Sequence, residues 1–262
     1  MAGSLPFRAE AGVARLLFDN PRRLNAIDAE MWRALPGLLA RVAGDPSIRV
    51  LVLAGAGERA FCAGNDVSEF DAIRADPEAA ERYNALQRSA AEALLGLNKP
   101  VVAAVHGYCL GAGLEFALMS DLRIFTADAR LGVPAVKLGL PYRLEDILKV
   151  VDVVGLARAR EMVLLGRQYG GDEAFALGLA HRLVPDRAAL AEAADGIARE
   201  LAENAPLSLA AAKVAFREAA RRDAPPDLDL ARRFADACYA SRDYAEGRAA
   251  RREKRPPRFE GR

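Results

Sequence analysis

Short apolar runs alternate with helical segments up to about residue 185, and this alternation limits the fold more than any other feature. Residues 49–54 and 101–105 are almost wholly apolar, which is typical of strands buried on both faces of a sheet. Further strands are expected at residues 13–18, 122–125 and 183–184, and helices at residues 28–42 and 77–96. Asp28 is the expected N-cap of the first helix. The pattern predicts an α/β core.

Strand patterns end near residue 186, and only helical segments follow. They are expected at residues 186–204, 207–222, 228–240 and 242–252. Interleaved strands and helices followed by helices alone predict an α/β core with a helical C-terminal appendage. A chain of 262 residues is long enough to bury a core of this kind.

Composition excludes several classes of protein. The chain is 52% hydrophobic and carries 37 Lys and Arg against 36 Asp and Glu, so intrinsic disorder is excluded and a basic surface for nucleic acid or membranes is not expected. There is no apolar stretch of about 18 residues. The three cysteines, Cys62, Cys109 and Cys238, share no metal-ligand spacing, so neither a metal site nor a disulfide framework is expected. Without a visible secretory signal, we expect a cytoplasmic protein.

A first glycine cluster follows the strand that ends at Ala54. Residues 55–60 match the pattern G-x-G-x-x-[GA], which binds dinucleotides when a helix opens there and points its N-terminus at a pyrophosphate. The stretch that follows, residues 61–66, is rich in turn formers and does not suit a helix. A surface turn is therefore the favoured interpretation of this cluster.

A second cluster, residues 106–115, follows the strand that ends at Val105, and here a helix does follow. Small residues at 111–113 leave backbone N–H groups bare at the helix N-terminus, which suits a developing oxyanion. Glu115 lies three residues after Ala112, so a carboxylate and an oxyanion site would share the first helical turn. The spacing alone leaves open a second interpretation. In it, the small residues serve only close packing and Glu115 only complements the helix dipole.

Together, residues 61–67 and 103–115 closely resemble the two signature segments of the crotonase (enoyl-CoA hydratase/isomerase) family. Residues 20–27, 120–127, 178–180 and 241–247 resemble further family segments in the same order. The resemblance implies a crotonase-like α/β fold, with a catalytic spiral of ββα turns over residues 1–200. It also implies a C-terminal helical module, residues 201–262, that forms a homotrimer or a dimer of trimers. The implied substrates are acyl-CoA thioesters, with coenzyme A as part of the substrate and no separate cofactor.

The resemblance also implies roles for individual residues. An enolate-like intermediate would be held by the backbone N–H groups of Asn65 and Ala112, and Glu115 matches one of the two glutamates of family hydratases. Substrate or coenzyme A contacts are expected from Arg22, Arg23, Ala26, Ala63, Gly64, Asp66, Val67, Gly111, Ala135 and Lys254.

Three positions depart from the hydratase pattern. Ala135 stands where the second glutamate is expected, Tyr142 matches the methylmalonyl-CoA decarboxylase branch, and Asn65 is polar where hydratases carry a small residue. Hydration of a 2-enoyl-CoA remains the leading hypothesis. The alternatives are a decarboxylase of the methylmalonyl-CoA type, a double-bond isomerase, and a non-catalytic scaffold.

Several other polar residues are expected to be structural. His106 is interpreted as making a hydrogen bond in a turn rather than acting as a base. Arg74, Arg82 and Arg88 are expected on the exposed side of their helix, and the basic tail at residues 251–255 is expected to be solvated apart from Lys254.

Overall fold

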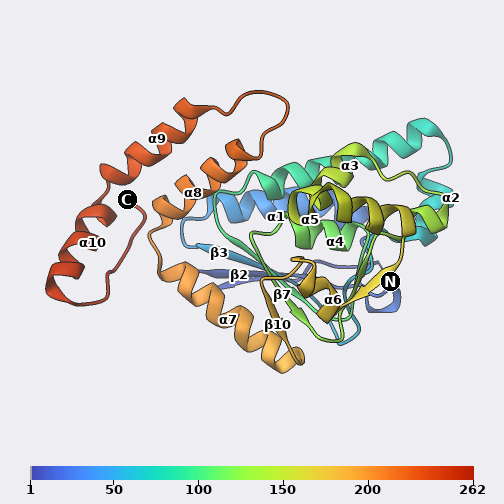
Figure 1. Cartoon of the computed structure of the whole chain (residues 1–262), viewed down its shortest axis with the longest axis horizontal. Coiled ribbons are helices and arrows are strands. Elements are labelled where there is room, and N and C mark those ends of the chain that lie inside the picture. The colour runs from blue at the N-terminus through green and yellow to red at the C-terminus, as the bar shows by residue number, and fades with distance from the viewer. Residues whose placement is uncertain (1) are drawn as a thin grey trace.

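The computed structural model describes residues 2–262, and its centre is a six-stranded sheet (Figure 1). The strand order is β1 (Phe7–Glu10), β2 (Val13–Phe18), β3 (Val50–Gly55), β5 (Val101–Val105), β7 (Leu122–Thr126) and β10 (Arg182–Val184). β1 pairs antiparallel with β2, and all other pairs are parallel. Every residue of β5 is buried, as the apolar run predicts for a strand covered on both faces.

A second sheet of short strands lies beside the first. It contains β4 (Ala60–Cys62), β6 (Tyr108–Leu110), β8 (Arg130–Gly132) and β9 (Gln168–Gly170). β4, β6 and β8 pair in parallel, and β9 joins β8 antiparallel. The chain thus runs three times through a strand of the first sheet, a strand of the second and then a helix, which makes the successive turns of a spiral.

Helices cover both faces of the larger sheet (Figure 1). The core helices are α1 (Ala29–Gly44), α2 (Phe70–Ile73), α3 (Pro77–Leu95), α4 (Ala112–Met119), α5 (Leu144–Leu165), α6 (Gly171–Ala176) and α7 (Arg187–Glu203). Short 3₁₀ helices occur at Pro21–Arg23, Val67–Glu69 and Pro134–Leu138. Val50, Val102 and Ile124 pack against α7 on one face, whereas α1, α3 and α4 close the main core on the other.

Local signals explain why these helices begin where they do. The Asp28 side chain accepts a hydrogen bond from the Met31 amide, so its predicted capping role is confirmed. Asp76 caps α3 in the same way through Ala79. α5, which the sequence pattern does not predict, is interrupted at Gly155, where φ is 74°. The break divides it into two shorter segments.

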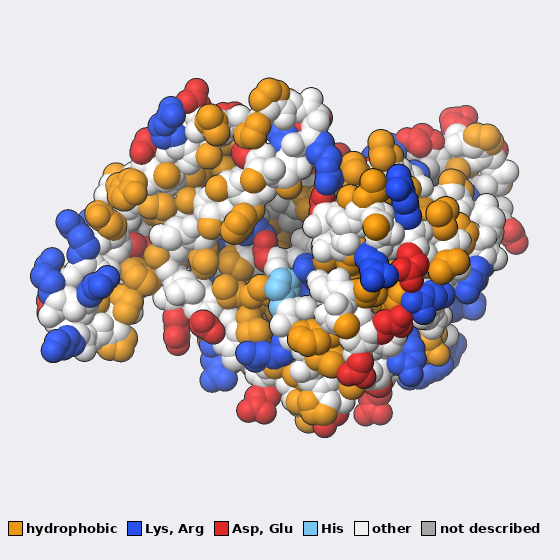
Figure 2. All heavy atoms as spheres, in the orientation of Figure 1, with side chains coloured by type: hydrophobic (Ala, Val, Ile, Leu, Met, Phe, Trp, Pro, Cys, Tyr) orange, Lys and Arg blue, Asp and Glu red, His pale blue; other side chains and the backbone are white. Residues whose placement is uncertain are grey.

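The C-terminal helices α8 (Pro206–Ala219), α9 (Leu228–Tyr239) and α10 (Arg242–Glu253) form an arm that extends from the core (Figure 1). The final residues fold back on this arm, where the Asp243 carboxylate accepts hydrogen bonds from the amides of Glu260 and Gly261. Apolar side chains lie along the surface of the arm (Figure 2), and Phe216 and Tyr239 are exposed there.

The α/β core and the helical C-terminus are confirmed, whereas a boundary at residue 200 stays a prediction. Gly55 ends β3 and Ala60 begins β4, so the first glycine cluster is a turn between strands rather than the start of a helix. Among the helices within residues 2–262, none has the length and apolar character needed to cross a membrane.

Candidate active site

A cavity of about 570 Å³ lies beside the two glycine-rich segments. Its apolar wall includes Trp32, Phe70, Phe116 and Leu138. Most of the residues predicted for the site line this one cavity, and they are Ala63, Gly64, Asn65, Val67, Gly111, Ala112, Glu115, Ala135 and Tyr142. The fold therefore brings together segments that are far apart in the sequence.

Two backbone amides face this cavity without an internal partner. Within residues 2–262, neither the Asn65 nor the Ala112 N–H donates a hydrogen bond to another protein group. Gly64 brings them close: its φ is +98°, and a Cβ built on it would lie 2.8 Å from the Leu110 carbonyl oxygen and 3.4 Å from the Ala112 nitrogen. Two bare donors, of which Ala112 lies at the N-terminus of α4, can stabilise negative charge that develops on a carbonyl oxygen.

Glu115 extends from the first turn of α4 into the same cavity. Its Oε2 accepts a hydrogen bond from Lys149 Nζ at 2.7 Å, and each of the two side chains is 13% exposed. Burial raises the pKa of Glu115, and the positive charge of Lys149 offsets part of this effect. A carboxyl group with a raised pKa is suited to take up and return a proton near neutral pH.

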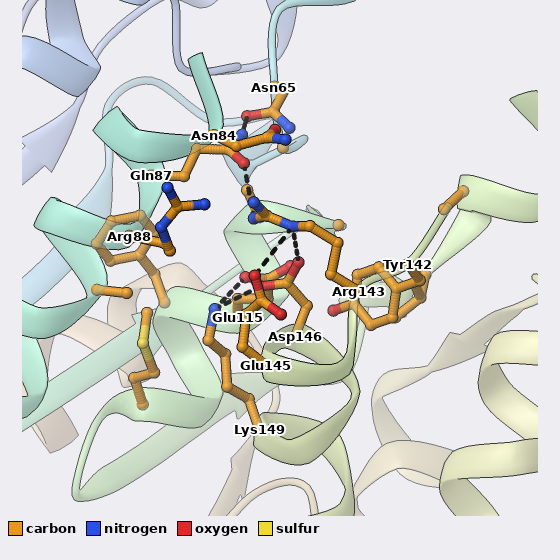
Figure 3. A pocket seen from close by; sticks show the side chains of 18 of the residues that line it. Asn65, Asn84, Gln87, Arg88, Glu115, Tyr142, Arg143, Glu145, Asp146 and Lys149 are labelled. Atoms are coloured by element: carbon orange, nitrogen blue, oxygen red, sulfur yellow. Dashed lines mark hydrogen bonds and ion pairs between the residues drawn. The ribbon is translucent and has the colours of Figure 1, made fainter. Parts of the chain in front are cut away.

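Lys149 also contacts a second carboxylate on its own helix, as Figure 3 shows. Its Nζ donates to Asp146 Oδ1 at 2.8 Å, and Arg143 Nε donates to Asp146 Oδ2 at 3.0 Å. Burial opposes the charge on Lys149, but Glu115 and Asp146 outweigh it and raise the Lys149 pKa. Burial likewise opposes the charge on Asp146, but Lys149 and Arg143 lower its pKa. Lys149 is thus held as a cation between two carboxylates.

The polar network continues from α5 to the loop that carries Asn65. Arg143 Nη2 donates to Gln87 Oε1 at 3.1 Å, and Gln87 Nε2 donates to Asn65 Oδ1 at 2.8 Å. The same Asn65 oxygen also accepts hydrogen bonds from Trp32 Nε1 and the Tyr83 hydroxyl, at 3.1 and 3.3 Å. These bonds anchor the Asn65 side chain and leave its backbone N–H facing the cavity.

The chain resembles proteins of one family over its whole length. The family model described as Enoyl-CoA hydratase/isomerase matches residues 8–262. The chain belongs to this family, also called the crotonase family. Carnitinyl-CoA dehydratase of Proteus mirabilis is 33% identical over 100% of both chains. The 1,2-epoxyphenylacetyl-CoA isomerase of Escherichia coli is 36% identical over 96% of each.

Solved structures of the family share the fold. An enoyl-CoA hydratase/carnitine racemase from Magnetospirillum magneticum matches with a TM-score of 0.91 and 34% identity, over 99% of this chain and 97% of that chain. The predicted α/β crotonase fold with C-terminal helices is therefore confirmed, and the protein is a crotonase-family acyl-CoA enzyme.

Two positions set this crotonase apart from a two-glutamate hydratase. Ala135 lines the cavity on the 3₁₀ helix Pro134–Leu138, and its methyl group can neither donate nor accept a proton. The Tyr142 hydroxyl is buried in the cavity wall beside the Glu115 carboxyl group. Burial, together with the charge of Glu115, raises the pKa of Tyr142 well above its usual range, so the phenol keeps its proton.

Five of the predicted contact residues lie outside the cavity lining. They are Arg22, Arg23, Ala26, Asp66 and Lys254. Arg22 and Arg23 are exposed on the 3₁₀ helix Pro21–Arg23, and Lys254 ends α10 in the arm. Their expected coenzyme A contacts stay predictions.

The sequence analysis missed the polar residues of α5. Lys149 and Asp146 lie three residues apart, so they share a helix face, but the pattern gives no sign that this face meets Glu115. The prediction for Arg74 is wrong. It lies at the end of α2, where its guanidinium stacks on the rings of Phe70 and Tyr83 and lines the cavity. Arg82 is exposed, as expected.

The remaining candidate nucleophiles and bases are structural. Cys62 and Cys109 are fully buried, and burial raises the pKa of both thiols, that of Cys62 to about 12, so neither is an activated thiolate. His106 is buried outside the cavity lining. Within residues 2–262, no cluster of His, Cys, Asp and Glu side chains is arranged to hold a metal ion.

Proposed function

We propose that this crotonase catalyses the reversible hydration of a 2-enoyl-CoA. The single observation that carries the proposal is the shared cavity of two bare backbone amides, from Asn65 and Ala112, and one buried carboxylate, from Glu115. This set combines an oxyanion site with a proton-transfer group, which addition of water next to a thioester carbonyl requires. The relatives named as a dehydratase and an isomerase act on acyl-CoA thioesters by their names.

In this mechanism the thioester oxygen accepts hydrogen bonds from the Asn65 and Ala112 amides. Glu115, ionised, takes a proton from water through Oε1, because Oε2 is held by Lys149. The water oxygen forms a bond to C3, the pair of the C2–C3 double bond becomes the C1–C2 double bond, and the carbonyl pair moves onto the thioester oxygen to give the enolate. Glu115 then returns its proton to C2, so one carboxyl group serves both steps. Each amide donor is worth about 3–4 kcal/mol of transition-state stabilisation.

A second candidate is decarboxylation of a malonyl-type thioester, and the buried Tyr142 hydroxyl beside Glu115 favours it. Here the bond from C2 to the carboxylate breaks, CO₂ leaves, and the electron pair of that bond forms the same enolate. The Asn65 and Ala112 amides would donate hydrogen bonds to its oxygen. A proton from the Tyr142 phenol or from protonated Glu115 completes the thioester. No second carboxylate is needed, which agrees with Ala135.

One panel of coenzyme A esters distinguishes these reactions. The enzyme is assayed with crotonyl-CoA, a 3-enoyl-CoA and methylmalonyl-CoA, and the products are separated by chromatography. Hydration predicts a 3-hydroxyacyl-CoA from crotonyl-CoA, and isomerisation predicts that the double bond of the 3-enoyl-CoA moves. Decarboxylation predicts that CO₂ is released from methylmalonyl-CoA and that this release is reduced in Tyr142→Phe. If all three substrates remain unchanged, the enzymatic proposal fails and the scaffold hypothesis takes its place.

The arm provides a surface for self-association. Phe216, Leu228 and Tyr239 expose 73%, 67% and 68% of their surface in the single chain, and such side chains favour burial against a partner. The proposed assembly is a homotrimer or a dimer of trimers, in which Lys254 of one subunit would reach the coenzyme A phosphates of the next. Sedimentation equilibrium tests it, and a monomer at micromolar concentration would contradict it.

A further inference from the structure

Arg74 places a positive charge in the cavity wall without a matching carboxylate. Within residues 2–262 it forms no ion pair, and its Nε is buried with no hydrogen-bond partner. Its guanidinium lies 4.6 Å from the Phe70 ring centroid and 4.7 Å from that of Tyr83. This stacking fixes the guanidinium plane but satisfies none of its in-plane N–H donors, because the rings lie over the face of the cation.

A second guanidinium lines the same cavity. Arg143 gives Nε to Asp146 and Nη2 to Gln87, but its Nη1 is buried and has no partner within residues 2–262. The two cations repel each other: burial lowers the pKa of Arg74, and the charge of Arg143 lowers it further. A charge in a cavity wall without an opposite charge beside it is costly, so Arg74, which has no ion-pair partner in the described part of the chain, makes this part of the cavity suited to an anionic group of a ligand.

The amide side chains around Arg74 add to this arrangement. Asn84 Oδ1 accepts a hydrogen bond from Arg74 Nη2 at 3.2 Å, which orients the Arg74 guanidinium at the cavity wall. The Gln87 side-chain oxygen accepts a hydrogen bond from Arg143, and its nitrogen donates one to Asn65, so the bonds that hold the Asn65 side chain also orient Arg143. Hydrogen bonds thus connect Arg143, through Gln87, to Asn65.

We propose that the acyl group of the substrate ends in a carboxylate, which Arg74 and Arg143 bind. The inference rests on the proposed acyl-CoA function and names its substrate class: the mono-coenzyme A thioester of a short dicarboxylic acid. A planar carboxylate offers several lone pairs to a guanidinium fork, which forms strong, charge-assisted bonds. A cationic acyl group would be repelled by Arg74, which has no ion-pair partner within residues 2–262, and a plain alkyl chain would leave its charge unbalanced.

Binding of two unreactive thioesters tests the inference without any turnover. Glutaryl-CoA carries the terminal carboxylate, and its ω-amide has the same size and shape without the charge. We expect calorimetry to show that the wild type binds glutaryl-CoA about 10- to 100-fold more tightly than the amide, as for a charged hydrogen bond. Arg74→Met reduces this preference to less than threefold, and Arg74→Lys keeps part of it.

Arg82→Met is the matched control, because Arg82 is exposed on α3 and pairs only with Glu78. It should keep the wild-type preference. Equal affinity of the wild type for the two thioesters, or a preference that survives Arg74→Met, would overturn the inference. Turnover of glutaconyl-CoA and crotonyl-CoA separates the two proposals. If both are hydrated and the carboxylate gives no preference, the inference fails and the hydratase proposal stands. If glutaryl-CoA is preferred over its amide in binding but neither enoyl thioester is turned over, the hydratase proposal fails and the inference stands.

Discussion

Replacing Lys149 by methionine removes the cation that holds the Glu115 carboxylate. Lys149 Nζ lies 2.7 Å from Glu115 Oε2 and 2.8 Å from Asp146 Oδ1 in a largely buried setting. In the variant, Glu115 loses a favourable partner and retains the unfavourable charge of Asp146, which already raises its pKa. Both changes raise the pKa of Glu115 further.

The size of the effect follows from the distance and the burial. An opposite charge within hydrogen-bond range lowers a carboxyl pKa by about 1–3, which corresponds to about 1.4–4 kcal/mol. Glu115 must be ionised to take a proton from water, so kcat/KM rises with pH through its pKa. Without Lys149, the acidic limb of the pH profile is expected to move to higher pH by about 1–3 pH units.

The assay is the pH dependence of kcat/KM for hydration of a 2-enoyl-CoA. Lys213→Met is the matched control, because Lys213 is also 13% exposed and pairs with Asp121 at 2.6 Å, but it lies outside the cavity lining. It should change stability while leaving the limb in place, and Lys149→Arg should keep the limb near its wild-type position. An acidic limb that stays unmoved in Lys149→Met would refute the assigned role of Lys149.

Two further predictions concern packing and burial. In Gly113→Ala, the new Cβ would lie 2.1 Å from the Cys62 carbonyl oxygen, so α4 must shift. We expect a loss of about 1–3 kcal/mol in stability and up to about 100-fold in kcat, whereas Gly196→Ala, with open space around it, should gain slightly in stability. Unfolding and initial-rate measurements check this, and full activity of Gly113→Ala would contradict it. Burial lowers the pKa of His106 to about 4, below its value in the unfolded chain, so the stability it contributes is complete above about pH 6.5 and is lost as pH falls towards 4. His106→Gln should flatten the pH dependence of unfolding in that window by up to about 3 kcal/mol, and an unchanged slope in denaturant titrations would disprove it.

Residues with strong local signals could be predicted from the sequence. The buried run at β5 and the Asp28 cap mark their elements because burial on both faces and side-chain capping each leave a local pattern. The three-residue strands of the second sheet leave none, since a strand such as Ala60–Cys62 is too short to show alternation. Its pairing with β6 arises only when distant turns of the spiral stack.

The site divides in the same way. Glu115 and the Asn65 and Ala112 amides could be found because they lie within glycine-rich motifs. Lys149 and Arg74 could not be found, because their function depends on which neighbours the fold supplies. Arg74 would be an ordinary surface residue without the Phe70 and Tyr83 rings that hold it at the cavity.

The activity of Glu115→Gln with crotonyl-CoA tests the central claim most directly. The change keeps the size of the side chain and removes only its capacity to take a proton. Turnover is expected to fall by more than about 100-fold, while affinity for an unreactive thioester stays within a few-fold and the exposed control Glu78→Gln matches the wild type. Turnover that survives in Glu115→Gln would contradict the account.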